Sequence, residues 1–222
     1  MMAIIVTVLK VGKEYSTKHA QWLHSQLPKD LQSVCLSDAD VAGVDTLPLT
    51  GNWPGWWSKL EIFNPELPTI GDQDLLFLDL DTVIVGDISP LLEVQKFTAL
   101  TDFYREKMPC APMASAVMYI PEAIKKRVWT AWLDDPKENM RQCNSPEKHG
   151  DQGFIGSVIS ADRWQDIMPG SIISYKKDIV RQGKIPLAVG NGLVPHDTRI
   201  VCFHGKPRPW ECNEAWIPKI DI

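Results

Sequence analysis

The sequence predicts an α/β protein with a largely parallel sheet, and three features of the chain support this class. Residues 3–9 and 33–37 are short apolar runs separated by a stretch with helical spacing, so the chain opens as a β-α-β unit. Residues 75–85 form an apolar run bounded by Gly-Asp pairs, which is typical of a strand buried on both faces. Polar residues follow several of these runs, where open α/β sheets bind ligands.

The first half of the chain then follows in order. Thr17 can cap a helix whose apolar positions recur every three to four residues, and Pro28 ends it. A loop with three indoles spans residues 51–57 and runs into a short helix at 58–63. These indoles pack in the core or form a stacking platform for a sugar or base. Residues 88–92 begin another short helix, with proline near its first turn.

The second half alternates strands and helices in the same way. We expect strands at residues 98–101, 117–120 and 200–203. Pro121 starts a helix with a tryptophan stripe that belongs to the core. Residues 134–150 are polar and predict a long surface loop. Asp151 and Gln152 open a further helix, and Asp151 is either its cap or a functional group.

Length and composition set the broad class. A chain of 222 residues suits one domain over residues 1–222, and the net charge of −5 disfavours a surface that tracks nucleic-acid phosphates. Five cysteines without a Cys-x-x-Cys pair suit a reducing compartment. The apolar start lacks a basic leader, and no apolar run approaches the roughly 20 residues of a spanning helix. We therefore expect a soluble, cytoplasmic protein.

Asp79 and Asp81 are the strongest chemical signal. Side chains two apart on a strand share a face, and two adjacent carboxylates repel unless a cation or proton lies between them. Such oxygen ligands suit Mg²⁺ or Mn²⁺, which complete their coordination with water and substrate phosphate. The alternative is a turn whose aspartates face water, since Asp-x-Asp spacing alone is weakly specific.

Two more polar sites stand at the ends of predicted strands, namely residues 102–105 and His204 with Lys206. The carboxyl ends of parallel strands share one edge, so these groups are expected to meet Asp79 and Asp81. Two carboxylates and a neutral imidazole can hold a divalent ion, and nearby cations can neutralise a diphosphate. That combination favours departure of a nucleoside diphosphate.

The order and spacing of these motifs resemble the GT-A glycosyltransferases of family 8, the glycogenin and lipopolysaccharide galactosyltransferase group. The similarity covers most of the chain and rests on Trp57–Phe63, Phe77–Ile84, Asp151-Gln152 and Phe203–Trp210. It implies a single-domain, Rossmann-like fold with a mixed, mostly parallel sheet flanked by helices. It also implies a metal-dependent glycosyltransferase that uses a nucleotide sugar, with UDP and Mn²⁺ (or Mg²⁺) expected, and that retains anomeric configuration.

The resemblance also assigns roles to individual residues. The metal ligands would be Asp79, Asp81 and His204, with Asp79 also near the donor ribose. Lys206 would hold the diphosphate, and Lys59 and Asp102 would contact the donor sugar. Asp151 and Gln152 would lie beside the reacting carbon. Residues after the first strand would line the base, namely Thr7, Leu9 and Lys10. The acceptor is left open among a saccharide, a lipid-linked glycan, a protein and a modified nucleobase.

Departures from the family leave other readings open. Ala114-Ser115-Ala116 replaces the family's Asn-Ala-Gly, and Gly205 directly follows His204 in a compressed loop, so the donor is uncertain. Residues 79–83 also resemble the nucleophile loop of a haloacid-dehalogenase-type phosphatase, although the Gly150–Ile155 segment supplies no second acid. A nucleotidyltransferase and a non-catalytic sugar-binding protein are the remaining alternatives.

Overall fold

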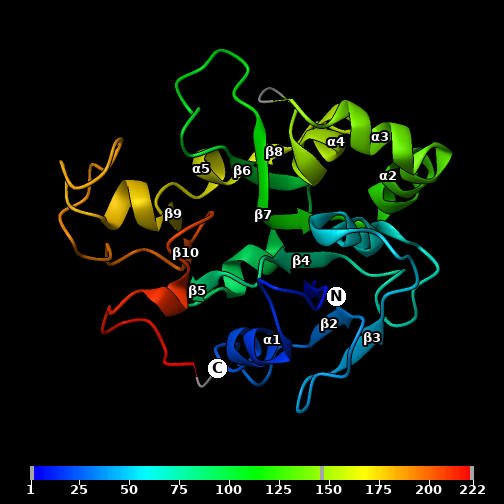
Figure 1. Cartoon of the computed structure of the whole chain (residues 1–222), viewed down its shortest axis with the longest axis horizontal. Helices are drawn as coiled ribbons and strands as arrows, with labels where there is room; N and C mark the ends of the chain where they lie inside the picture. The colour runs from blue at the N-terminus through cyan, green and yellow to red at the C-terminus, as the bar shows by residue number, and fades with distance from the viewer. Residues whose placement is uncertain (1–2, 146–147, 221–222) are drawn as a thin grey trace.

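A computed structural model describes residues 3–145 and 148–220 and has a seven-stranded main sheet (Figure 1). Its strands run in the order β3-β2-β1-β4-β7-β6-β8. The bounds are β1 Ile4–Leu9, β2 Ser33–Ser37, β3 Thr46–Pro48, β4 Leu75–Leu78, β6 Thr98–Thr101, β7 Met113–Ile120 and β8 Asp162–Arg163.

The main sheet is mixed and mostly parallel, which confirms the predicted fold class. Strand β1 pairs in parallel with β2 and β4, and β2–β3 and β6–β8 are also parallel. Strand β7 is antiparallel to both β4 and β6. In this register Val6 lies beside Val34 and Phe77, so apolar side chains from three strands meet at the centre. Because β1 and β4 run in parallel, their carboxyl ends open on the same edge.

Residues 75–85 are divided between two strands, and the first ends directly before Asp79, where the paired carboxylates were expected to mark a strand end. Strand β4 ends at Leu78, and a turn follows in which the Thr82 N–H and hydroxyl both donate to the Asp79 carbonyl. The chain then enters a second, three-stranded sheet of order β5-β10-β9. Its strands are β5 Thr82–Ile84, β9 Ile172–Ser174 and β10 Ile200–Cys202. The predicted strand at residues 200–203 therefore belongs to this second sheet.

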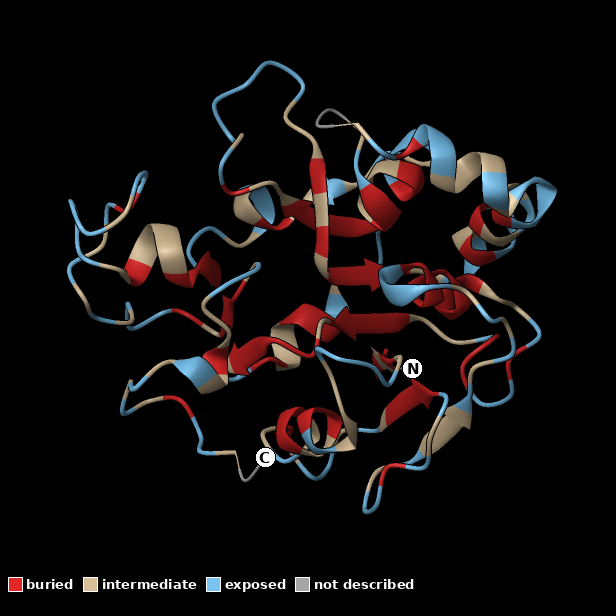
Figure 2. Ribbon diagram, viewed as in Figure 1, coloured by how far each residue is buried: buried red, intermediate tan, exposed pale blue. Residues whose placement is uncertain are grey.

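Helices cover both faces of the main sheet (Figures 1 and 2). The helical elements are α1 Thr17–His24, η1 Gly55–Phe63, η2 Ser89–Glu93, α2 Glu122–Asp134, α3 Pro136–Gln142, α4 Gly150–Val158, α5 Trp164–Ile167, η3 Tyr175–Ile179 and η4 Pro209–Glu211. One apolar cluster joins α1 and the second sheet to one face, and another joins η1, α2 and α4 to the opposite face. No helix in the described ranges combines the length and apolarity needed to cross a membrane.

Two local predictions are wrong. Ser16, not Thr17, precedes the first turn of α1, and the Ser16 N–H donates to Nδ1 of His19. The predicted loop at residues 134–150 contains helix α3. Asp135 caps α3 by accepting from the Glu138 N–H at 3.0 Å, and proline occupies its first turn.

Candidate active site

A cavity of about 670 Å³ lies at the carboxyl ends of β1 and β4. Its walls come from segments far apart in the sequence: the loop after β1, the turn after β4, η1, the first turn of α4 and the loop after β10. The predicted site residues that line it are Lys10, Lys59, Asp79, Asp81, Asp151, Gln152 and His204. The structure therefore brings together most of the polar groups that the sequence placed at strand ends.

Lys59 joins three polar groups on the floor of this cavity. Its Nζ atom lies 2.9 Å from Asp79 Oδ1, 3.1 Å from Asp151 Oδ2 and 3.1 Å from Ser115 Oγ. The Ser115 hydroxyl also donates to Asp151 at 2.6 Å. Burial alone would lower the pKa of Lys59, but the carboxylates of Asp151 and Asp79 outweigh it and raise that pKa. The ammonium is therefore held charged between two aspartates.

Local structure explains these positions. Helix η1 carries Lys59 and the fully buried Glu61. Both carboxylate oxygens of Glu61 accept from the 50–51 segment, including a 2.9 Å bond from the Gly51 N–H, which anchors η1 to that loop. Asp151 lies in the first turn of α4, where His149 is the N-cap, so its carboxylate is favoured by the helix dipole without capping the helix.

Asp81 pairs with Arg208, a residue that the sequence analysis did not select. Arg208 Nη1 contacts Asp81 Oδ2, and its Nη2 donates to Glu14 Oε2 at 2.9 Å. The guanidinium also lies 5.2 Å from the ring centre of Tyr15. Trp210 anchors this loop by packing against aromatic side chains of α1 and Tyr15. The sequence feature that could have indicated this role is the Arg-Pro-Trp at positions 208–210, which places the arginine two residues before an aromatic anchor.

Lys206 does not reach the cavity. Its side chain is 83% exposed and donates to Glu211 Oε1 at 3.1 Å. The predicted diphosphate lysine is thus turned outward, and the cation that lines the cavity from this loop is Arg208. A compressed loop explains the difference, since Gly205 with a φ of 68° turns the chain directly after His204.

The floor of the cavity has more acid than base. Asp79, Asp81 and Asp151 face two buried cations, Lys59 and Arg208. Burial raises the pKa of both Asp79 and Asp81, against the opposing effects of Lys59 on Asp79 and of Arg208 on Asp81. The three carboxylates outnumber the two cations by one. Carboxylate oxygens are ligands that hard divalent ions prefer, so these groups fit an added ion whose remaining coordination comes from water or phosphate.

His204 lines the same cavity but is not grouped with the aspartates. Its Nε2 lies 2.7 Å from Ser174 Oγ, and its ring contacts those of Phe103 and Tyr104. Within residues 3–145 and 148–220, no three His, Cys, Asp or Glu side chains are grouped closely enough to hold a metal ion. Burial, reinforced by Lys176, lowers the pKa of His204 to about 4, so its ring is neutral near pH 7.

Of the three predicted base-lining residues, Lys10 lines the cavity and the other two do not. Thr7 and Leu9 are fully buried, and the Thr7 hydroxyl bonds His24 Nε2 at 2.9 Å. Between them Val8 lines the cavity, because side chains alternate along β1. Lys10 also pairs with Asp38 at 3.2 Å.

Four other residues complete the comparison with the sequence. Asp102 pairs with Arg105 at 3.1 Å and accepts from the Tyr104 N–H, and it is not among the residues that line the cavity. Gln152 lines the cavity from α4. Of the three indoles in the 51–57 loop, Trp57 stacks on Trp132 in the core, whereas Trp56 is 56% exposed and lines the cavity.

Comparison with known proteins identifies the fold. Neither a protein-family model nor a curated protein sequence matches the chain. Among solved structures, the galactosyltransferase LgtC with donor and acceptor sugar analogues superposes with a TM-score of 0.61 at 12% identity, covering 94% of this chain and 90% of LgtC. An active-site mutant of LgtC, with glutamate in place of a glutamine, gives 0.60 at 13% identity over 95% and 91%.

A third solved structure agrees with these two. The glycosyltransferase GlyE of Streptococcus pneumoniae gives a TM-score of 0.58 at 16% identity, covering 94% of this chain and 56% of GlyE. At such identities the likeness is one of fold, and it confirms the expected GT-A architecture.

Proposed function

We propose that this protein is an enzyme that transfers a sugar from a nucleotide-sugar donor, a UDP-sugar, to an acceptor hydroxyl. The observation that carries the proposal is the convergence of Lys59, Arg208 and three carboxylates, two of them buried, on one cavity at a sheet edge. Buried cations stabilise the negative charge that grows on a departing diphosphate. Arg208 takes the role first given to Lys206, because its planar guanidinium suits a phosphate and already lies in the cavity.

The metal and the donor sugar complete this proposal. Asp79 and Asp81 would hold Mn²⁺ or Mg²⁺, whereas His204, the third predicted ligand, lines the same cavity but is not grouped with them. When bound, the ion would neutralise diphosphate charge as a Lewis acid. Lys59 and Ser115 fix the Asp151 carboxylate, which with Gln152 would face the reacting carbon of the donor sugar. We propose retention of anomeric configuration on the basis of the family resemblance.

The test is a thermal-shift screen of UDP-sugars with and without Mn²⁺, followed by measurement of UDP released without an acceptor. A donor that binds the folded state raises the melting temperature, and the correct donor is slowly hydrolysed. Release of phosphate from simple monoesters, without any response to nucleotide sugars, would contradict the proposal and favour the phosphatase. Donor binding without hydrolysis or transfer would indicate a non-catalytic binding protein.

A further inference from the structure

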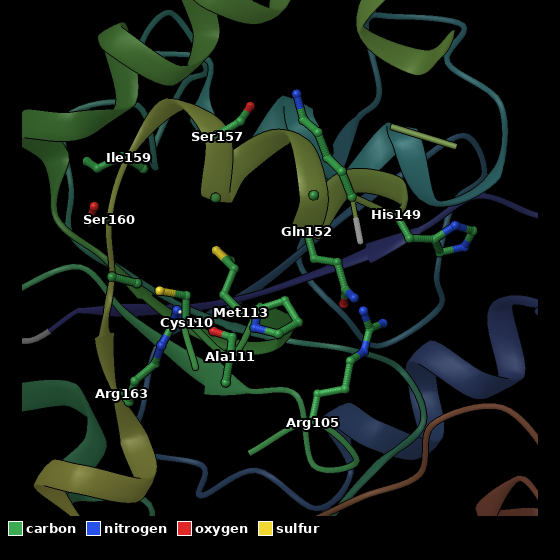
Figure 3. A pocket seen from close by; sticks show the side chains of 15 residues that line it. Arg105, Cys110, Ala111, Met113, His149, Gln152, Ser157, Ile159, Ser160 and Arg163 are labelled. Carbon is green, nitrogen blue, oxygen red and sulfur yellow. Dashed lines mark hydrogen bonds between the residues drawn. The ribbon is translucent and has the colours of Figure 1, made fainter. Parts of the chain in front are cut away.

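A second cavity, of about 350 Å³, lies beside the first and shares His149 and Gln152 with it. One wall is the segment after β6, which contributes Arg105 and Cys110, and the other is α4 with the residues around it (Figure 3). In Figure 3 the side chain of Arg105 extends toward the Gln152 amide. A group bound here would therefore lie next to the proposed reacting centre.

The charge of this second cavity is one-sided. Among the described residues, three cationic side chains line it, Arg105, Lys148 and Arg163, and no Asp or Glu does. Such a lining is unusual in a chain with a net charge of −5. A concentration of positive charge in a cleft attracts an anionic ligand and raises its local concentration.

Two of the three cations have no neutralising carboxylate among the residues that the structure describes. Arg105 is paired with Asp102 at 3.1 Å. Within the described ranges, neither Arg163 nor Lys148 has a carboxylate at ion-pair distance. The charge of Asp166 acts on Arg163 from beyond that distance. Lys148 instead lies near the thiol of Cys143. The cavity therefore carries about two positive charges in excess.

Arg163 also has unused donor capacity. Its Nη2 makes one long bond, 3.4 Å, to the Ala111 carbonyl, and its buried Nη1 has no hydrogen-bond partner among the described residues. A buried donor left without a partner is unfavourable, and an anion at the guanidinium would accept its hydrogen bond. A phosphate monoester carries about −1.5 to −2 charge near pH 7 and so matches the excess better than a carboxylate does.

We propose that this second cavity is the acceptor subsite and binds the phosphate group of a phosphorylated saccharide. The inference rests on the proposed function. The acceptor hydroxyl oxygen would form a bond to the anomeric carbon while the bond from that carbon to the diphosphate breaks, and the hydroxyl proton would pass to the departing diphosphate. The volume of the cavity lies within the range of small-ligand sites.

Calorimetry with glucose 6-phosphate, glucose and glucuronate as probes tests the subsite on the wild-type protein saturated with UDP. We expect binding of the phosphorylated sugar at least about tenfold tighter than that of glucose or glucuronate, because a charge-assisted bond to a phosphate is worth about 1.5–3 kcal/mol. Equal binding of all three sugars, or preference for glucuronate, would overturn the proposal.

Variants locate the phosphate group. Arg163→Gln and, as an independent second variant, Lys148→Gln should each weaken glucose 6-phosphate binding about tenfold. Arg141→Gln, an exposed arginine on α3 outside both cavities, is the matched control and should bind like the wild type. Circular dichroism checks that each variant is folded. If both cavity variants fold and bind like the control, the subsite is wrong.

Failure of the inference and failure of the proposed function give different results. If the wild type hydrolyses a UDP-sugar but shows no preference for the phosphorylated sugar, only the acceptor inference falls. If the phosphorylated sugar binds and protects the exposed Cys110 thiol from alkylation, yet no nucleotide sugar is bound or hydrolysed, the anion site stands and the transferase reaction falls.

Discussion

The Nζ atom of Lys59 lies 2.9 Å from Oδ1 of Asp79, and this contact connects the floor of the cavity to the core. The lysine comes from η1, which packs on one face of the main sheet, and the aspartate from the turn at the end of β4, a strand of that sheet. The ammonium also lies 4.9 Å from the ring centre of Phe77. The cation of the proposed site is therefore also in contact with the core.

Replacing Lys59 with methionine should destabilise the protein by about 3 kcal/mol. The change keeps most of the packing volume but leaves the buried Asp151 and the half-buried Asp79 carboxylates without their cation, and breaking a buried pair on one side costs about 3–5 kcal/mol. We take the lower end because the Asp79 side chain is 29% exposed. Urea unfolding at pH 7 measures the change.

A second substitution provides the control for Lys59. Adding Asp151→Asn to Lys59→Met removes one of the uncompensated charges and should recover part of the lost stability. Lys137→Met, at an exposed position on α3, should leave the unfolding free energy nearly unchanged. An unchanged unfolding midpoint for Lys59→Met would show that the lysine contributes nothing net to stability.

Arg208 and Lys206 should differ sharply in their effect on nucleotide binding. Arg208→Gln removes a buried guanidinium that lines the cavity, so UDP binding should weaken at least about tenfold. Lys206→Gln removes an exposed ammonium paired with Glu211, and its effect should stay within about twofold. Calorimetric titration with UDP measures both. The reverse ranking would restore Lys206 as the diphosphate residue.

The sequence located the floor of the cavity because the apolar run of β4 marks where a buried strand ends. Asp79 and Asp81 follow that strand directly, and Lys59 comes from the helix packed beside it. The sequence alone did not determine which side chains outside the strand interiors face the cavity. Thr7 and Leu9 differ from the lining residues Val8 and Lys10 by one position, and on a strand one position reverses the face.

The errors in the second half of the chain have a common cause. The composition of residues 134–150 favours a loop, yet Asp135-Pro136 starts helix α3 at a capping position. In the same way Lys206 was selected by its place in a motif, whereas the turn at Gly205 and the packing of Trp210 direct Arg208 into the cavity. Both outcomes depend on local geometry and tertiary contacts that spacing does not encode.

Asp81→Asn should preserve the fold and remove nearly all Mn²⁺-dependent donor hydrolysis. The amide keeps the shape but loses the charge that would hold the ion and that now pairs with Arg208. UDP release at increasing Mn²⁺ concentration measures the effect, with at least about a hundredfold loss expected, as for the removal of one strong electrostatic group from an active site. Activity that is unchanged and independent of Mn²⁺ would count against the metal site.

His204 should make the folded protein less stable as the pH falls. Its folded pKa of about 4 lies below the ordinary value of 6.5, so the unfolded chain binds a proton first. The stabilisation that depends on a neutral ring is complete above about pH 6.5 and is lost progressively down to about pH 4. Since the ring is only partly buried, we expect a total effect of about 1 kcal/mol.

Comparing the wild type with His204→Gln isolates this effect from the other titrating groups. Glutamine can still bond the Ser174 hydroxyl but does not titrate, so the unfolding free energy of the variant should fall less between pH 7 and pH 4.5. His24, whose pKa burial also lowers to about 4, contributes equally to both proteins and cancels. Asp79, with a raised pKa, acts in the opposite direction, because the folded state then binds the extra proton. If the unfolding free energies of the two proteins changed in parallel with pH, the His204 ring would titrate at its ordinary pKa. The ring would then be partly protonated near pH 6.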